Sequence, residues 1–72
     1  GAGYVKSPLP GVILNIHVRE GETVKVGAKL ITLEAMKMEN NINADKDGVI
    51  KSIKVKAGDS VLEGEVLIEI GD

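Results

Sequence analysis

The segment Gly11–Glu34 reads GVILNIHVREGETVKVGAKLITLE, and Gly48–Gly71 reads GVIKSIKVKAGDSVLEGEVLIEIG. When the sequence is displaced by 37 positions, the two segments share their glycines and most of their Val, Ile and Leu residues. Because turn residues and apolar positions repeat together, each segment is predicted to form the same supersecondary unit. A unit this short cannot bury a core alone, so the two units are expected to pack on each other.

The apolar residues within each unit recur with a period of two, which is typical of strands with one buried face. In the first unit the predicted buried series is Val12, Leu14, Ile16 and Val18, and it alternates with Ile13, Asn15, His17 and Arg19. The second unit repeats this alternation from Val49 to Lys56. His17 therefore falls on the outward series and is interpreted as a surface residue.

Glycine turns divide each unit into three strands, and one short strand precedes each unit, near Tyr4–Lys6 and Asn41–Ala44. The sequence therefore predicts an all-β fold of eight strands. We expect two four-stranded antiparallel sheets, packed as a flattened barrel or sandwich and related by a pseudo-twofold axis.

Composition excludes several classes of function. The 72 residues are enough for one domain, assigned to 4–72, with Gly1–Gly3 read as a linker or cloning remnant without the features of a signal peptide. The chain has no cysteine and one histidine, so no metal site is expected. A net charge of −2 and a single aromatic residue argue against nucleic-acid binding. No apolar run approaches the roughly 18 residues of a membrane span, so no membrane insertion is expected and a cytoplasmic location is predicted.

The segment Ala35–Asn40 joins the two units at the middle of the chain. It contains no Gly or Pro, so the ordinary expectation is a continued strand with Met36 and Met38 packed in the core. The repeat argues against this, because Leu33 matches Ile70 at the end of a predicted strand. We therefore predict a tight turn at Met36-Lys37 that places the lysine at the tip of a protruding hairpin. Such turns favour Asn-Gly, and a turn that departs from this preference indicates a functional constraint.

The run Glu34-Ala35-Met36-Lys37-Met38-Glu39 resembles the attachment motif of biotinyl domains, the biotin carboxyl carrier proteins. In that family the lysine of Ala-Met-Lys-Met carries biotin through an amide bond. The resemblance covers nearly the whole chain and implies the biotinyl/lipoyl fold, a barrel-sandwich hybrid, with biotin as the cofactor on Lys37. Residues 18–23 are too few to hold the protruding thumb of some bacterial carriers. The chain is therefore similar to the thumbless type found in acyl-CoA and pyruvate carboxylases, decarboxylases and transcarboxylases.

The resemblance also implies partners and a role without catalysis. Biotin protein ligase would transfer biotin from biotinyl-adenylate to Lys37, and the carrier would then serve biotin carboxylase and carboxyltransferase or decarboxylase domains. The residues expected to be recognised by these enzymes are Glu34, Ala35, Met36, Met38 and Glu39. An ordinary charged surface explains Glu34 and Glu39 equally well. A further partner face is predicted at Pro8, Leu9, Pro10 and Gly11, which also read as a rigid turn.

Two other functions are compatible with this pattern. A lipoyl domain also modifies a hairpin lysine, but that family usually has Asp before the lysine and Ala after it, whereas here Met36 and Met38 flank it. An unmodified interaction module would bind a protein partner through the same two methionines and would gain no mass from ligase, ATP and biotin. Catalysis by the chain itself is not indicated, because the sequence offers no nucleophile–base pair.

Overall fold

The computed structural model describes residues 3–72, which form eight strands and no helix. The strands are β1 (Gly3–Lys6), β2 (Gly11–Ile16), β3 (Thr23–Val24), β4 (Lys29–Ala35), β5 (Met38–Asn43), β6 (Gly48–Ile53), β7 (Ser60–Val61) and β8 (Val66–Gly71). The predicted number of strands is confirmed, although β5 begins three residues before the strand expected at Asn41. Of the predicted linker, Gly1 and Ala2 lie outside the described residues, and Gly3 opens β1.

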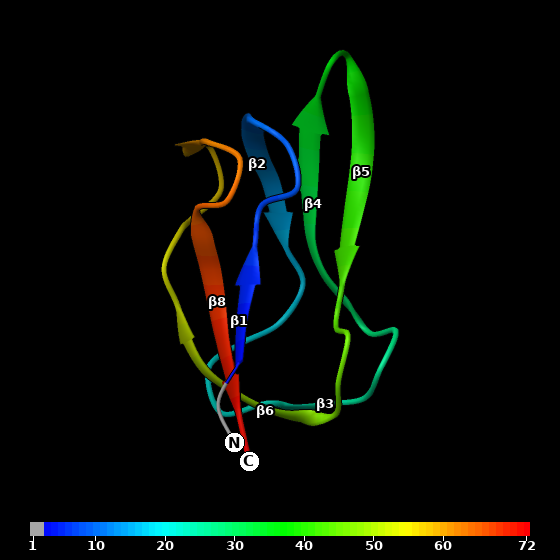
Figure 1. Ribbon diagram of the computed structural model, residues 1–72, viewed down its shortest axis with the longest axis vertical. Helices are drawn as coiled ribbons and strands as arrows, with labels where there is room; N and C mark the ends of the chain where they lie inside the picture. Colours follow the sequence, from blue (N-terminus) through cyan, green and yellow to red (C-terminus); the bar gives the residue numbers. More distant parts are fainter. Residues whose placement is uncertain (1–2) are drawn as a thin grey trace.

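The strands form two antiparallel sheets whose orders are β1-β8-β6-β3 and β5-β4-β2-β7. Replacing each strand of the first sheet by its counterpart in the other repeat gives the second sheet, which is the predicted pseudo-twofold relation. Each sheet combines the two repeats, because β7 pairs with β2 and β3 pairs with β6. Figure 1 shows the resulting elongated molecule, with both termini at one end and the β4–β5 hairpin at the other. The predicted fold class is confirmed.

A β-bulge in each repeat makes the observed buried face differ from the predicted one. In β2 the side chain of Ile13 is buried, whereas Val12 and Leu14 are only partly buried. The register shifts between Ile13 and Asn15, so one extra residue reverses which side chains face inward. The same shift occurs 37 positions later, between Ile50 and Ser52. The strict alternation from Val12 to Val18 was therefore wrong before the bulge and right after it, where His17 is exposed and Val18 is buried.

The hydrophobic core between the sheets is built from aliphatic side chains. The side chains with at most 1% exposure are Ile13, Leu30, Ile31, Leu33, Ile50, Leu67, Ile68 and Ile70, together with the small polar Ser7 at 2%. Full burial of each Leu or Ile stabilises the fold by about 1.5–3 kcal/mol. Because such interiors are close-packed, this core forms a rigid base for the strands that carry the hairpin.

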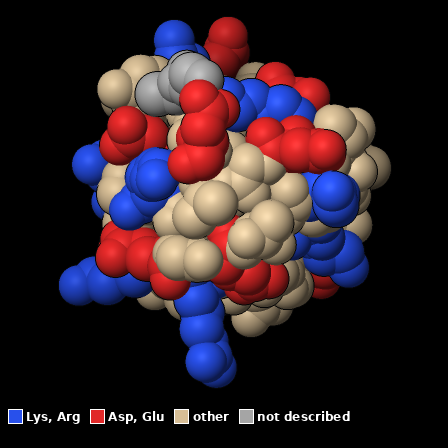
Figure 2. Space-filling model, turned by 90° about the horizontal axis from the view of Figure 1, so that it is seen from below, with Lys and Arg blue, Asp and Glu red and all other residues tan. Residues whose placement is uncertain are grey.

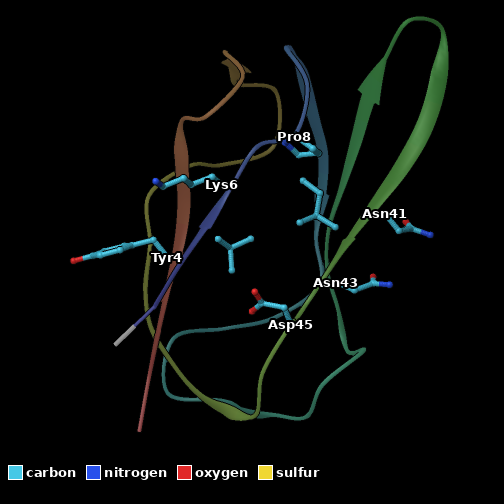
Figure 3. Close-up of a pocket in the computed structure, with 8 residues that line it drawn as sticks. Tyr4, Lys6, Pro8, Asn41, Asn43 and Asp45 are labelled. Carbon is cyan, nitrogen blue, oxygen red and sulfur yellow. The ribbon is translucent and has the colours of Figure 1, made fainter. Parts of the chain in front are cut away.

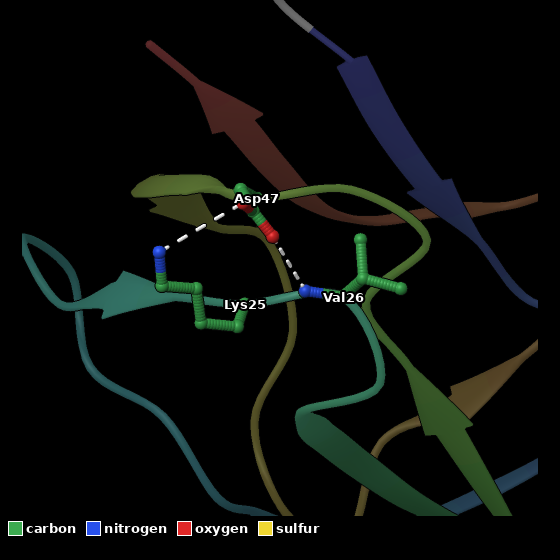
Figure 4. Close-up of polar contacts among 3 residues, drawn as sticks. All are labelled: Lys25, Val26 and Asp47. Carbon is green, nitrogen blue, oxygen red and sulfur yellow. Dashed lines mark hydrogen bonds and ion pairs between the residues drawn. The ribbon is translucent and has the colours of Figure 1, made fainter.

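The end that carries the termini shows no concentration of one charge. Acidic and basic side chains are interspersed over it in the view from below (Figure 2). Toward this end, the Asp47 carboxylate accepts a hydrogen bond of 2.8 Å from the backbone N–H of Val26 and lies 3.8 Å from the Lys25 ammonium (Figure 4). These contacts join the two repeats, because Val26 follows β3 and Asp47 precedes β6.

Candidate functional site

The hairpin between β4 and β5 closes through the two residues Met36 and Lys37. Their φ angles are 54° and 63°, and a positive φ at both central residues is the requirement of a type I′ turn. The other positive φ angles in residues 3–72 belong to Gly21, Gly27, Gly58 and Gly64. The predicted turn is therefore confirmed, and it is formed by two side-chain-bearing residues in a conformation that L residues avoid.

All three side chains of the turn region project into solvent. Met36 is 83% exposed and Met38 is 65% exposed, so the interpretation of these methionines as core residues is wrong. Lys37 is also exposed, and within residues 3–72 its amine forms no hydrogen bond or ion pair. Only Ala35, which is 4% exposed and pairs with Met38, anchors the base of the turn in the core. The lysine amine is thus accessible from solvent at the far end of the molecule.

Two carboxylates flank the turn. Glu34 on β4 and Glu39 on β5 are exposed and lie directly opposite each other in the antiparallel pair. Like charges at directly opposed positions destabilise a strand pair. The hairpin therefore carries an acidic collar just below the lysine, at a small cost to its own stability.

The segment Pro8–Gly11 lies at the same end of the molecule as the hairpin (Figure 1). The hydroxyl of the buried Ser7 donates a hydrogen bond of 2.7 Å to the carbonyl oxygen of Leu9, which fixes this turn. A Cβ placed on Gly11 would lie 2.3 Å from the carbonyl oxygen of Glu34 and 3.2 Å from Ala35 Cβ. Gly11 is therefore needed for β2 to approach the base of the hairpin, and the structure brings the two predicted regions together.

Three hydrogen-bonded side chains, those of His17, Thr32 and Asn41, form a polar row that stabilises the hairpin below its turn. Thr32 on β4 and Asn41 on β5 are cross-strand partners, and the Thr32 hydroxyl donates a hydrogen bond of 3.1 Å to Asn41 Oδ1. His17 Nε2 lies 2.7 Å from the same hydroxyl. Because that hydroxyl has a single proton, His17 Nε2 is the donor in this arrangement. These bonds tie the hairpin to the segment after β2, and they give His17 a structural role on the surface.

Leu62 was not identified from the sequence as an exposed apolar residue, although its side chain is 72% exposed. It follows β7, whose residue Val61 pairs with Gly11, so Leu62 lies at the hairpin end of the molecule. Its counterpart in the first repeat is the charged Lys25. The repeat itself thus contained the signal, because an apolar residue stands at a turn position where the other copy is charged.

A cavity of about 240 Å³ opens between the edge strands β1 and β5 (Figure 3). Its lining consists of residues related by the repeat: Tyr4 with Asn41, Val5 with Ile42, Lys6 with Asn43, and Pro8 with Asp45. The cavity therefore follows the pseudo-twofold axis. None of its lining residues belongs to the turn at Met36-Lys37, so it is separate from the exposed lysine.

Residues 3–72 contain no group of three or more His, Cys, Asp or Glu side chains that could hold a metal ion. They also contain no helix long and apolar enough to cross a membrane. A rigid β-sandwich that presents an exposed lysine amine on a two-residue turn with positive φ angles is suited to carrying a covalently bound group on that amine.

Comparison with known families identifies which attachment domain this is. The model of the family described as biotin-requiring enzyme matches residues 3–70, and the chain belongs to this family. The resemblance inferred from the hairpin motif is thereby confirmed, and so is biotin as the cofactor. The amine of Lys37, which is exposed and forms no hydrogen bond or ion pair within residues 3–72, fits a group bound through an amide bond.

Two relatives and one solved structure illustrate the range of the family. The mitochondrial propionyl-CoA carboxylase alpha chain of Homo sapiens is 42% identical over 69 residues, which are 96% of this chain and 10% of that protein. The biotin/lipoyl attachment protein of Bacillus subtilis (strain 168) is 40% identical over 68 residues, which are 94% of this chain and 93% of that protein. The Kluyveromyces lactis urea carboxylase superposes with a TM-score of 0.92 at 31% identity, over 99% of this chain and 6% of that chain. The chain thus spans about a tenth of the propionyl-CoA carboxylase alpha chains that it matches.

Proposed function

We propose that this chain is a biotin carboxyl carrier domain and that Lys37 is its site of biotin attachment. The observation that carries the proposal is the turn at Met36-Lys37, where two non-glycine residues hold positive φ angles of 54° and 63° and the amine is exposed. Strained, exposed conformations persist where a function requires them. The membership in a biotin-requiring family supports the same assignment.

Attachment would use only the Lys37 amine. The ammonium first gives up one proton, and the neutral Nζ then attacks the activated carboxyl carbon offered by a ligase. The activating group leaves, Nζ loses a second proton, and the amide keeps one N–H. The product is neutral, so the hairpin loses its positive charge and keeps the acidic collar of Glu34 and Glu39. Biotin, once bound, supplies a ureido group that can hold a carboxyl group.

The domain would then act by position and not by catalysis. The four-carbon stem of Lys37 extends the attached group away from the sandwich, and the core below the hairpin is rigid. A tethered group reaches each partner site at the high effective concentration set by its linker. No nucleophile–base pair is needed in the carrier, because the chemistry takes place in the partner enzymes.

Recognition by the ligase and by the carboxylase partners is assigned to the hairpin end. Its exposed part contains Glu34, Met36, Met38 and Glu39, while the buried Ala35 fixes the base of the turn. Methionine side chains are flexible and polarisable, which suits a surface that must fit more than one partner. The turn at Pro8–Gly11 is the second part of this face, because Gly11 packs directly against the hairpin.

The partner enzyme is proposed to be a biotin-dependent carboxylase. The relatives include alpha chains of propionyl-CoA carboxylase, an acyl-coenzyme A carboxylase subunit and a pyruvate carboxylase. The link between β2 and β3 holds only residues 17–22, which agrees with the thumbless type. A cytoplasmic location stays a prediction, since the relatives include mitochondrial and bacterial proteins.

The test is the intact mass before and after incubation with biotin protein ligase, ATP and biotin. We expect one added biotinyl group on the parent chain and none on Lys37→Arg. Lys25→Arg is the matched control, because Lys25 is also a highly exposed lysine and should leave the added mass unchanged. No added mass on a folded, previously unmodified parent would overturn the proposal. A mass gain with lipoate and its ligase would then identify a lipoyl carrier, and no gain with either would leave an interaction module.

A further inference from the structure

All the sulfur of this protein lies on one hairpin. The chain has two methionines and no cysteine, and the methionines occupy the positions on either side of Lys37. Thioethers and thiols are the side chains most readily oxidised by peroxides. The oxidisable sulfur atoms are thus confined to the two neighbours of the attachment lysine.

Both thioethers are accessible, and neither supports the fold. Met36 is 83% exposed and Met38 is 65% exposed. The buried core consists of Ile, Leu, Val and Ala side chains and contains no methionine. Oxidation usually damages proteins by placing a polar sulfoxide in a packed interior. Here the sulfoxide would stay in solvent, so the modification can change the surface of the hairpin without unfolding the domain.

We propose that Met36 and Met38 form a paired methionine-sulfoxide site that controls access of the biotin ligase to Lys37. The co-reactant is a hydroperoxide, with hydrogen peroxide as the simplest member. The thioether sulfur attacks one peroxide oxygen, the O–O bond breaks, and an S=O bond forms. The sulfur is oxidised by two electrons, and the hydrogen peroxide is reduced to one molecule of water. This inference rests on the proposed function of Lys37.

The effect on recognition follows from the change in polarity. A ligase that binds the turn must cover the two apolar side chains next to the amine that it acylates. A sulfoxide oxygen brought into that contact loses its water, and an unpaired polar group buried in this way weakens binding. We expect a fall in the rate of biotin attachment of about tenfold or more, the size that such a desolvation cost produces. Methionine sulfoxide reductases remove the oxygen, so the effect is reversible.

The experiment follows oxygen uptake and biotin attachment on the same samples. The folded, unmodified domain is treated with hydrogen peroxide, the peroxide is removed with catalase, and intact mass counts the added oxygen atoms. Biotin protein ligase, ATP and biotin are then added, and initial rates are compared for reduced and oxidised protein. Far-UV circular dichroism of the oxidised domain verifies that it is still folded. A portion repaired with both methionine sulfoxide reductases is assayed in parallel.

The control is Met36→Leu/Met38→Leu, which has no sulfur and should show the same rate with and without peroxide treatment. Two added oxygen atoms, an at least tenfold slower rate and recovery after repair support the proposal. Equal rates for oxidised and reduced parent overturn it, and so do unfolding on oxidation or an equal loss in the double variant. If the reduced parent accepts no biotin at all, the proposed function of Lys37 fails first, and the inference falls with it.

Discussion

Replacing Met36-Lys37 by Asn-Gly should stabilise the domain while removing its attachment site. Both residues hold positive φ angles, 54° and 63°, in a turn type that strongly prefers Asn-Gly. Each non-glycine L residue in this region costs about 1–2 kcal/mol. Asn tolerates the conformation better than Met, and Gly has no Cβ to clash. Glycine offsets about 0.5–1 kcal/mol of this gain, because it raises the entropy of the unfolded chain. The net gain expected for the double variant is roughly 1.5 kcal/mol.

Thermal and urea unfolding followed by far-UV circular dichroism would measure this gain. For a domain of 60–100 residues, 1 kcal/mol corresponds to roughly 4–8 °C in Tm, so the double variant should melt about 6–12 °C higher. The urea midpoint should rise with an unchanged m value, because the surface exposed on unfolding is the same. Met36→Asn alone should keep part of the gain together with the lysine.

A reverse substitution provides the matched control. Gly64 has a φ of 84°, and no atom lies within 4 Å of the Cβ that an alanine would add there. Gly64→Ala therefore measures backbone strain without a steric clash. It should cost about 1 kcal/mol once the reduced entropy of the unfolded chain is taken into account. If Gly64→Ala is destabilising as expected and the Asn-Gly variant is no more stable than the parent, the reasoning that the lysine turn is strained is refuted.

Three further predictions follow from contacts outside the turn. Gly11→Ala and Gly48→Ala each force a Cβ within 2.5 Å of a carbonyl oxygen, and each should lower the free energy of unfolding by about 1–3 kcal/mol. Only Gly11→Ala should also slow biotin attachment. Equal slowing by both variants would contradict the local role of Gly11. Thr32→Val should lower the free energy of unfolding in urea by about 1 kcal/mol, because it removes a hydroxyl with two hydrogen-bond partners. An unchanged urea midpoint would mean that the polar row does not stabilise the hairpin. Asp47→Ala should cost about 1 kcal/mol of stability, because it removes a hydrogen bond to the backbone. Lys25→Ala should change stability by less than about 0.5 kcal/mol, since the ion pair is long and exposed. Equal losses in the two variants would contradict this ranking of the two contacts.

Much of the fold and the central feature of the site were predictable from local signals in the sequence. A period of two and repeated turn glycines indicate strands wherever they occur, because strand geometry and tight turns are local properties of the backbone. The same repeat showed where the first unit ended, which located the turn at Met36-Lys37 even though its residues are poor turn formers. The motif around Lys37 then indicated the family. These inferences needed no knowledge of which strands pair.

What the tertiary structure decided depends on contacts between the repeats. Strand exchange between the sheets, such as β7 beside β2, cannot be read from periodicity, because the period of a strand does not say which other strand it pairs with. The bulges after Ile13 and Ile50 reversed the inward face through one unpaired residue, which only the partner strand reveals. Packing between segments far apart in the chain brought Gly11 against the hairpin and Leu62 to the same end. The sequence alone therefore determined the strands, the turn and the lysine, whereas long-range pairing determined the surface around that lysine.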